Sequence, residues 1–121
     1  TGIMRYLKEK NPDIKGVLAD PVGSIIGGGT EHKDYNIEGV GNDFIPDTMD
    51  TSLIDICIKV NDEQAFSTAK EITRREGVIA GSSSGADLWC ALELAKRIDK
   101  GNIVVLFPDR GDRYISKGLY D

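Results

Sequence analysis

The sequence has few residues that bind metals or form crosslinks. It contains one histidine and two cysteines in 121 residues. A structural zinc site needs about four closely placed histidine or cysteine ligands, so the sequence excludes one. Cys57 and Cys90 lie inside segments with regular hydrophobic patterns. We expect both to be small buried residues of a protein in a reducing compartment, not a disulfide pair.

The sequence also lacks an excess of basic residues and any long apolar run. Its formal net charge is −5, which disfavours nonspecific binding to the phosphates of nucleic acids. No apolar segment approaches the roughly 20 residues that span a bilayer. The first ten residues have the pattern of an amphipathic helix and not of a signal peptide. We therefore expect one folded domain that binds neither nucleic acid nor membranes.

Hydrophobic periodicity predicts strands and helices in alternation. Strand patterns occur at residues 15–20, 54–60, 78–80 and 102–107. Helical patterns occur at residues 1–10, 61–77, 82–100 and 112–118. A long glycine-rich loop is expected over residues 21–43. This order predicts an α/β fold with a mostly parallel sheet and helices on both faces.

The strongest local signal for a binding site is the turn between residues 78 and 86, Val-Ile-Ala-Gly-Ser-Ser-Ser-Gly-Ala. A strand meets a helix there, so free backbone N–H groups and the positive end of the helix dipole converge. This pattern alone indicates an anion site, such as a phosphate site. A tight turn with a serine N-cap is the alternative.

Two other segments are candidates for ligand contact. Asp109 follows the apolar run 103–107, and ligands of open α/β sheets bind beyond the carboxyl ends of strands. Asp109 is alternatively a turn residue that caps the next helix. Gly39 and Gly41 lie in a loop where glycine lets the backbone approach a ligand, unless the loop is only a connection. We expect His32 to be solvated.

Three segments in this order resemble the C-terminal half of the cystathionine β-synthase and cysteine synthase family. They are Glu38-Gly-Val-Gly-Asn-Asp-Phe-Ile-Pro46, Glu76-Gly-Val-Ile-Ala-Gly-Ser-Ser-Ser-Gly-Ala86 and Phe107-Pro-Asp-Arg-Gly-Asp-Arg-Tyr-Ile-Ser-Lys117. Asp20-Pro-Val-Gly-Ser24 and Thr1-Gly-Ile-Met-Arg-Tyr-Leu7 also match. The resemblance covers essentially the whole chain.

The resemblance implies fold type II of the pyridoxal phosphate enzymes, in which the cofactor lies between two α/β lobes. It implies that Ser83 contacts the pyridine nitrogen of the cofactor, which replaces the phosphate interpretation of the serine turn. A neutral hydroxyl there leaves the ring less electron-withdrawing than a carboxylate would. Pro108 and Asp109 would flank the ring. The residues implied for the substrate pocket are Gly39, Gly41, Asn42 and Asp43.

In the family, the Schiff-base lysine, the phosphate loop and the loop that binds the substrate carboxylate precede the part that matches this chain. No lysine here lies in the family's lysine motif. We therefore expect residues 1–121 to be the C-terminal portion of a β-replacement catalytic domain, without a catalytic residue of its own and inactive alone. Regulatory and haem modules outside the chain are left open.

The segments Asp20-Pro-Val-Gly-Ser24 and Asn42-Asp-Phe-Ile-Pro46 favour the cystathionine β-synthase branch. That branch converts L-serine and L-homocysteine into cystathionine and water. The alternatives are a cysteine synthase, which uses O-acetylserine and sulfide, and a non-catalytic α/β binding lobe. The resemblance further implies small amino-acid substrates, a cytoplasmic location and a homodimer.

Overall fold

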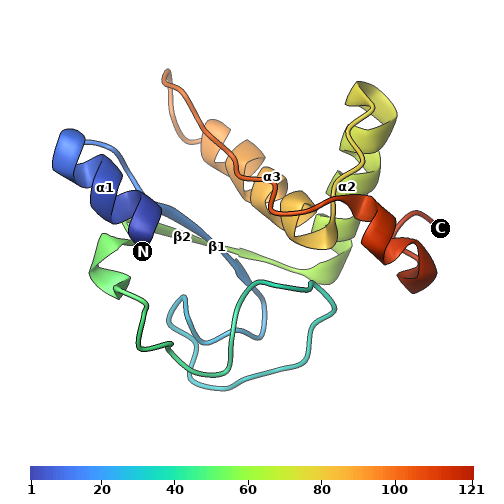
Figure 1. Cartoon of the computed structure of the whole chain (residues 1–121), viewed down its shortest axis with the longest axis horizontal. Helices are drawn as coiled ribbons and strands as arrows, with labels where there is room; N and C mark the ends of the chain where they lie inside the picture. Colours follow the sequence, from blue (N-terminus) through green and yellow to red (C-terminus); the bar gives the residue numbers. More distant parts are fainter.

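A computed structural model describes residues 1–121 (Figure 1). Three α-helices, two strands and two short 3₁₀ helices follow one another along the chain. In order they are α1 (Gly2–Lys10), β1 (Val17–Pro21), η1 (Thr51–Leu53), β2 (Ile56–Val60), α2 (Asp62–Glu76), α3 (Ser82–Ala95) and η2 (Gly111–Lys117). None of the helices is long and apolar enough to cross a bilayer.

The sheet consists of β1 and β2, which pair in parallel. Val17 is opposite Ile56 at one end, and Pro21 is opposite Val60 at the other. Helix α3 packs against both strands, and α2 packs against α3 (Figure 1). The predicted α/β class with parallel strands is therefore confirmed. The opposite face of the strands contacts the loop that follows β1, since a side chain at Gly27 would overlap Cys57 and Asp20.

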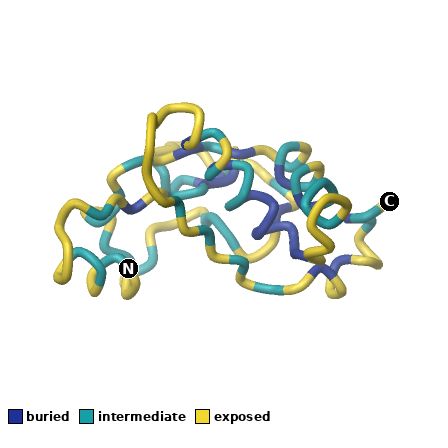
Figure 2. The backbone as a smooth tube through the Cα atoms, turned by 90° about the horizontal axis from the view of Figure 1, so that it is seen from above, coloured by how far each residue is buried: buried dark blue, intermediate teal, exposed yellow.

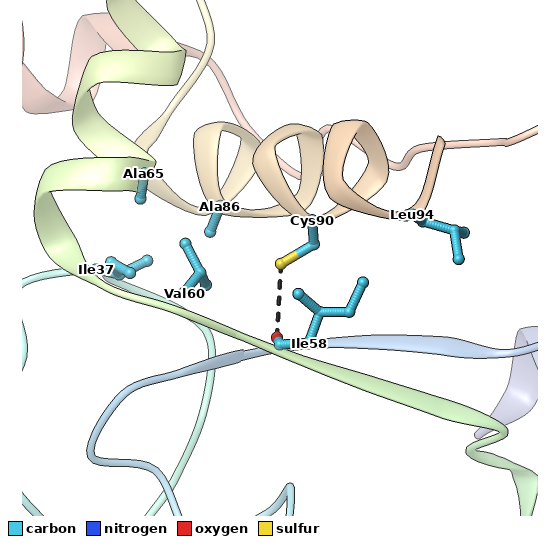
Figure 3. Close-up of a cluster of buried hydrophobic side chains, with 7 residues drawn as sticks. All are labelled: Ile37, Ile58, Val60, Ala65, Ala86, Cys90 and Leu94. Atoms are coloured by element: carbon cyan, nitrogen blue, oxygen red, sulfur yellow. Dashed lines mark hydrogen bonds between the residues drawn. The ribbon is translucent and has the colours of Figure 1, made fainter. Parts of the chain in front are cut away.

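The main core lies between α3 and β2. Ala86, Cys90 and Leu94 of α3 point toward Ile58 and Val60, as Figure 3 shows. The list of core residues is completed by Ala65 of α2 and Ile37 of the long loop. The Cys90 thiol donates a hydrogen bond to the Ile58 carbonyl at 3.5 Å, and burial raises its pKa to about 12. Cys90 is therefore the buried, unreactive residue that the sequence predicted.

The prediction that Cys57 is buried was wrong. Cys57 is exposed, and both thiols are free. Successive side chains of a strand point to opposite faces, so Cys57 lies on the other side of β2 from Ile58. Helix α3 covers only the Ile58 side, and the loop near Gly27 leaves Cys57 partly open.

The predicted ends of α2 are confirmed. The Asn61 side chain accepts a hydrogen bond from the Gln64 N–H, and the Gln64 side chain accepts one from the Asn61 N–H, both at 2.9 Å. This capping box satisfies two amides that the helix leaves free. At the other end, Gly77 adopts a left-handed conformation with φ 70°, which glycine tolerates without strain.

The predicted strands at residues 78–80 and 102–107 are not formed. Residues 102–107 alternate between half-buried and exposed, with Val104 95% exposed. The segment joins no sheet, because β1 and β2 pair only with each other. Residues 78–80 form only one bridge, from Ala80 to Arg110. Helix α3 also ends at Ala95, five residues earlier than predicted.

Buried residues gather along the strands and the first turns of α3, whereas α1 has none (Figure 2). A second small cluster joins Ala69 of α2 to Tyr114 and Leu119 of the C-terminal tail. The tail is thereby held beside the N-terminus of α3, where the candidate site lies.

Candidate functional site

The first turn of α3 is buried. Ser82, Ser83 and Ser84 are at most 3% exposed. The Gly85 N–H, which bonds to the Gly81 carbonyl at 3.1 Å, is the first amide with a partner inside the helix. The three serine amides before it therefore have no helical partner, and the positive end of the helix dipole adds to them.

The three serine hydroxyl groups have different surroundings. The Ser82 hydroxyl accepts a hydrogen bond from the Glu38 N–H at 3.2 Å. The Ser84 hydroxyl donates one to the Asp109 carbonyl at 3.5 Å. Ser83, 3% exposed, has no hydrogen-bond partner within the chain. The Ser83 hydroxyl is not among the fully buried polar atoms that lack a partner, so a ligand can reach it and supply one.

Helical geometry shows which way Ser83 faces. It precedes Ala86 by three positions and Cys90 by seven, so it shares their face of α3. That face is turned toward the strands (Figure 3). The N-terminus of α3 lies near Val60, where β2 ends, as the same figure shows. Ser83 is therefore on the sheet side of the helix, at the carboxyl ends of the parallel strands.

The segment after residue 107 meets the serine turn, so the two candidate segments lie side by side. The Gly81 N–H bonds to the Asp109 carbonyl at 3.3 Å, and the Gly111 N–H bonds to the Ile79 carbonyl at 3.1 Å. Asp109 does not cap η2, because the residue at that cap is Arg110 and no side chain bonds there. Pro108 is exposed beside it.

The Asp109 carboxylate is held at one oxygen only. Its Oδ2 accepts a hydrogen bond from the Tyr114 hydroxyl at 2.5 Å, whereas its Oδ1 is buried without a partner. A side chain at Gly81 would overlap Oδ1, so glycine is needed for this contact. The carboxylate thus lies directly against the N-terminus of α3, where the helix dipole favours negative charge.

We expect Tyr114 to ionise later than an ordinary tyrosine. Its hydrogen bond to Asp109, followed by burial, raises the pKa of Tyr114 from 10.0 to about 12. The free energy that this bond contributes to folding is therefore fully present below pH 10.0 and is lost as the pH rises toward about 12. An ultraviolet titration of tyrosinate should show a late step that Tyr114→Phe removes. If Tyr114→Phe removes a step near the ordinary pKa of tyrosine, the buried hydrogen bond is not formed.

The loop over residues 38–43, named the glycine loop for Gly39 and Gly41, is fixed near both of its ends. At one end, the Glu38 N–H bonds to Ser82, and the Glu38 carboxylate forms an ion pair with Lys117. At the other end, the Asn42 N–H bonds to the Ser24 hydroxyl at 3.0 Å. Between them, Gly39 and Gly41 adopt left-handed conformations with φ 81° and 72°, which explains why glycine is used there.

The predicted pocket residues of this loop differ in exposure. Asp43 is exposed, and Asn42 is half-buried. A side chain at Gly41 would come within 3.0 Å of Pro21, at the end of β1, whereas one at Gly39 would meet nothing. The structure therefore brings the loop, the serine turn and Asp109 to the same end of the strands.

A cavity of about 460 Å³ lies beside this turn. Its lining residues are Tyr35, Asn36, Glu38, Phe66, Ser82, Tyr114, Lys117 and Leu119. None of the residues assigned from the sequence lines it. Sequence patterns missed this group, because Glu38 and Lys117 are 79 positions apart and have no local signal that links them. No group of three or more His, Cys, Asp or Glu side chains is placed to hold a metal ion.

Comparisons with known proteins give matches over most of the chain. A family model described as "Pyridoxal-phosphate dependent enzyme" matches residues 1–109. The chain is 52% identical over 121 residues to an O-acetylserine dependent cystathionine β-synthase of Bacillus subtilis, and 42% identical over 120 residues to a cysteine synthase of Helicobacter pylori. The two matches cover 98–99% of this chain and 39% of each relative.

A solved structure gives the same result for the fold. The crystal structure of an O-acetylserine dependent cystathionine β-synthase from Helicobacter pylori matches with a TM-score of 0.87 at 41% identity. The match covers 98% of this chain and 39% of that one. The chain thus spans about two fifths of the length of these relatives.

Proposed function

Because this chain belongs to the pyridoxal-phosphate dependent enzymes, we propose that the protein catalyses a β-replacement that forms cystathionine from an activated serine and homocysteine. Proteins of this family use pyridoxal phosphate. The observation that carries the proposal is the 52% identity to an O-acetylserine dependent cystathionine β-synthase over 99% of the chain. The name of that relative favours O-acetylserine over free serine as the donor, and this refines the expectation from the motifs.

We propose residues 1–121 as the C-terminal portion of the catalytic domain. The chain covers 39% of the relatives that it matches. None of its lysines lies in the family's lysine motif, so the covalent anchor of the cofactor and the active enzyme need a further segment. A cytoplasmic homodimer is part of the same proposal.

Ser83 fits the ring of the cofactor. Its hydroxyl group has no partner in the chain, and the residue shares the face of α3 that carries Ala86 and Cys90, which pack toward β2. A hydroxyl group both donates and accepts hydrogen bonds, so it matches a ring nitrogen in either protonation state. When bound, pyridoxal phosphate withdraws electrons from the amino-acid substrate, so that the group on its β-carbon can leave. Ser83 orients the ring, and Pro108 and Asp109 flank it.

The glycine loop is suited to the substrate side of the site. Gly39 and Gly41 carry no side chain, so the backbone of the loop can approach a small amino acid. The bond from the Glu38 N–H to Ser82 fixes the loop relative to the helix turn that carries Ser83. Asn42 and Asp43 then lie at the mouth, with Asp43 in contact with solvent.

Cysteine synthase activity is the second candidate. The 42% identity to a cysteine synthase over 98% of the chain supports it. The two activities share the donor side of the reaction and differ in the thiol that attacks, which is homocysteine in one and sulfide in the other.

A donor and acceptor matrix tests the proposal in the complete protein loaded with pyridoxal phosphate. O-Acetylserine and L-serine are each combined with homocysteine and with sulfide, and the products are identified by mass spectrometry. We expect cystathionine from O-acetylserine and homocysteine to form fastest. Faster formation of cysteine from sulfide would assign a cysteine synthase, and faster use of L-serine would restore the donor expected from the motifs. A protein that binds no cofactor would be a non-catalytic lobe.

A further inference from the structure

Ser24 closes the tight turn that follows β1. Its N–H donates a hydrogen bond to the Pro21 carbonyl at 3.0 Å, and its carbonyl accepts one from the Lys59 ammonium at 2.9 Å. Pro21 is the last residue of β1, and Lys59 belongs to β2. The backbone of Ser24 is therefore fixed to both strands of the sheet.

The Ser24 hydroxyl joins this turn to the glycine loop through Asn42. It accepts a hydrogen bond from the Asn42 N–H at 3.0 Å and donates one to the Asn42 carbonyl at 3.2 Å. It also accepts the Ile26 N–H at 3.3 Å, and the Ile25 N–H donates to the Asn42 carbonyl at 2.9 Å. A hydroxyl group has one hydrogen and two lone pairs, so all three are in use. Ser24 is 1% exposed, which keeps solvent away from these bonds.

The glycine loop is anchored to α3 through its first residue and to the strands through Asn42. Between these anchors, the N–H groups of Gly39, Val40 and Gly41 donate to no other backbone group. Glycine has a wide range of backbone conformations, so this stretch has little shape of its own. A side chain at Gly41 would come within 2.9 Å of the Ser24 Cβ, so the loop lies directly against the turn. The position of the loop therefore depends on its anchors.

We propose, on the basis of the proposed function, that Ser24 is a positioning residue for the amino-acid substrate. It holds Asn42, and with it the free amides of the glycine loop, at the carboxyl ends of β1 and β2. A loop that is already ordered binds a ligand more tightly than one that the ligand has to order. Loss of the hydroxyl therefore weakens substrate binding and leaves the reaction of the bound substrate unchanged.

The test compares Ser24→Ala with the wild type in the complete protein loaded with pyridoxal phosphate. We expect the KM for O-acetylserine to rise about tenfold and kcat to change by less than about twofold. A general loss of folded protein would instead lower kcat and leave KM unchanged. Ser24→Cys, whose thiol is a weaker donor and acceptor of similar size, should give an intermediate KM.

Hydrogen exchange gives a second readout that needs no turnover. The amides of Ile25 and Asn42 should exchange about tenfold faster in Ser24→Ala, while those of β2 keep their wild-type rates. Ser67→Ala is the matched control. Ser67 is exposed on α2, where its hydroxyl donates to the Gln64 carbonyl at 3.2 Å. Its loss should change neither the KM nor the exchange of the glycine loop.

The inference is overturned if Ser24→Ala binds the cofactor and keeps the wild-type KM. It is also overturned if KM rises while the Asn42 amide exchanges at its wild-type rate, since the hydroxyl would then not hold the loop. Loss of the cofactor in both Ser24 variants but not in Ser67→Ala would assign Ser24 to the stability of the fold and overturn it too. Failure of the wild-type protein to bind pyridoxal phosphate or to consume O-acetylserine would instead contradict the proposed function.

Discussion

Replacement of Lys59 by methionine is expected to destabilise the folded protein by about 3–5 kcal/mol, the usual cost of leaving a buried charge without its partner. The Asp20 carboxylate is fully buried. Its Oδ2 forms an ion pair with the Lys59 ammonium and accepts the Gly27 N–H at 2.9 Å, while its Oδ1 has no partner. Without the ammonium group, one amide alone would face a buried negative charge. The free energy of unfolding in denaturant measures the loss.

The same lysine connects the strands to the glycine loop. Its ammonium also donates to the Ser24 carbonyl at 2.9 Å, and the Ser24 hydroxyl holds Asn42. We therefore expect Lys59→Met to loosen the loop as well, which faster amide exchange in residues 38–43 would show.

Two control variants isolate the buried charge. Arg75→Met breaks a surface ion pair with Glu71, whose partners are 74% and 47% exposed, and should cost less than about 1 kcal/mol. Asp20→Asn added to Lys59→Met should recover part of the lost free energy, because the neutral amide is cheaper to bury. Equal costs for Lys59→Met and Arg75→Met would show that Asp20 is solvated in the folded protein.

Replacement of Gly85 by alanine is expected to destabilise the protein by about 2–3 kcal/mol through overpacking. The added methyl group would overlap the carbonyl oxygen of Ala65 and lie 2.9 Å from the Ala69 side chain. Both belong to α2, whose backbone cannot yield without separating from α3. Alanine is the better helix former by about 1 kcal/mol, but this gain is smaller than the cost of the overlap.

Gly2→Ala is the matched control, since Gly2 is also a helical glycine and a side chain there would meet nothing within 4 Å. It should be neutral or slightly stabilising, as measured by the same denaturation. The Gly85 variant should also bind pyridoxal phosphate more weakly, because the shift of α3 moves Ser83. A Gly85→Ala protein as stable as wild type would mean that the two helices are less closely packed than the structure shows.

The sequence by itself determined the features that depend on neighbouring residues. Asn61 and Gln64, three positions apart, are enough to start α2, and Gly77 ends it. Alternation over residues 54–60 placed β2, and the serine turn marked the N-terminus of α3. The order of the motifs also indicated the family. These signals are local, so they act through propensity and capping wherever the rest of the chain lies.

Only the tertiary structure decided which segments meet. The apolar run 103–107 has the pattern of a strand, yet it has no hydrogen-bonded neighbour, and pairing depends on a partner outside the run. Asp20 and Lys59 are 39 positions apart, and Glu38 and Lys117 are 79 apart. Asp20 meets Lys59 because the two residues are opposite each other in the paired strands, and Glu38 meets Lys117 because packing holds the C-terminal tail in place. Neither pairing nor packing has a short sequence signature. For the same reason the sequence identified Ser83 through its motif, but only the tertiary structure placed Glu38 against the neighbouring Ser82.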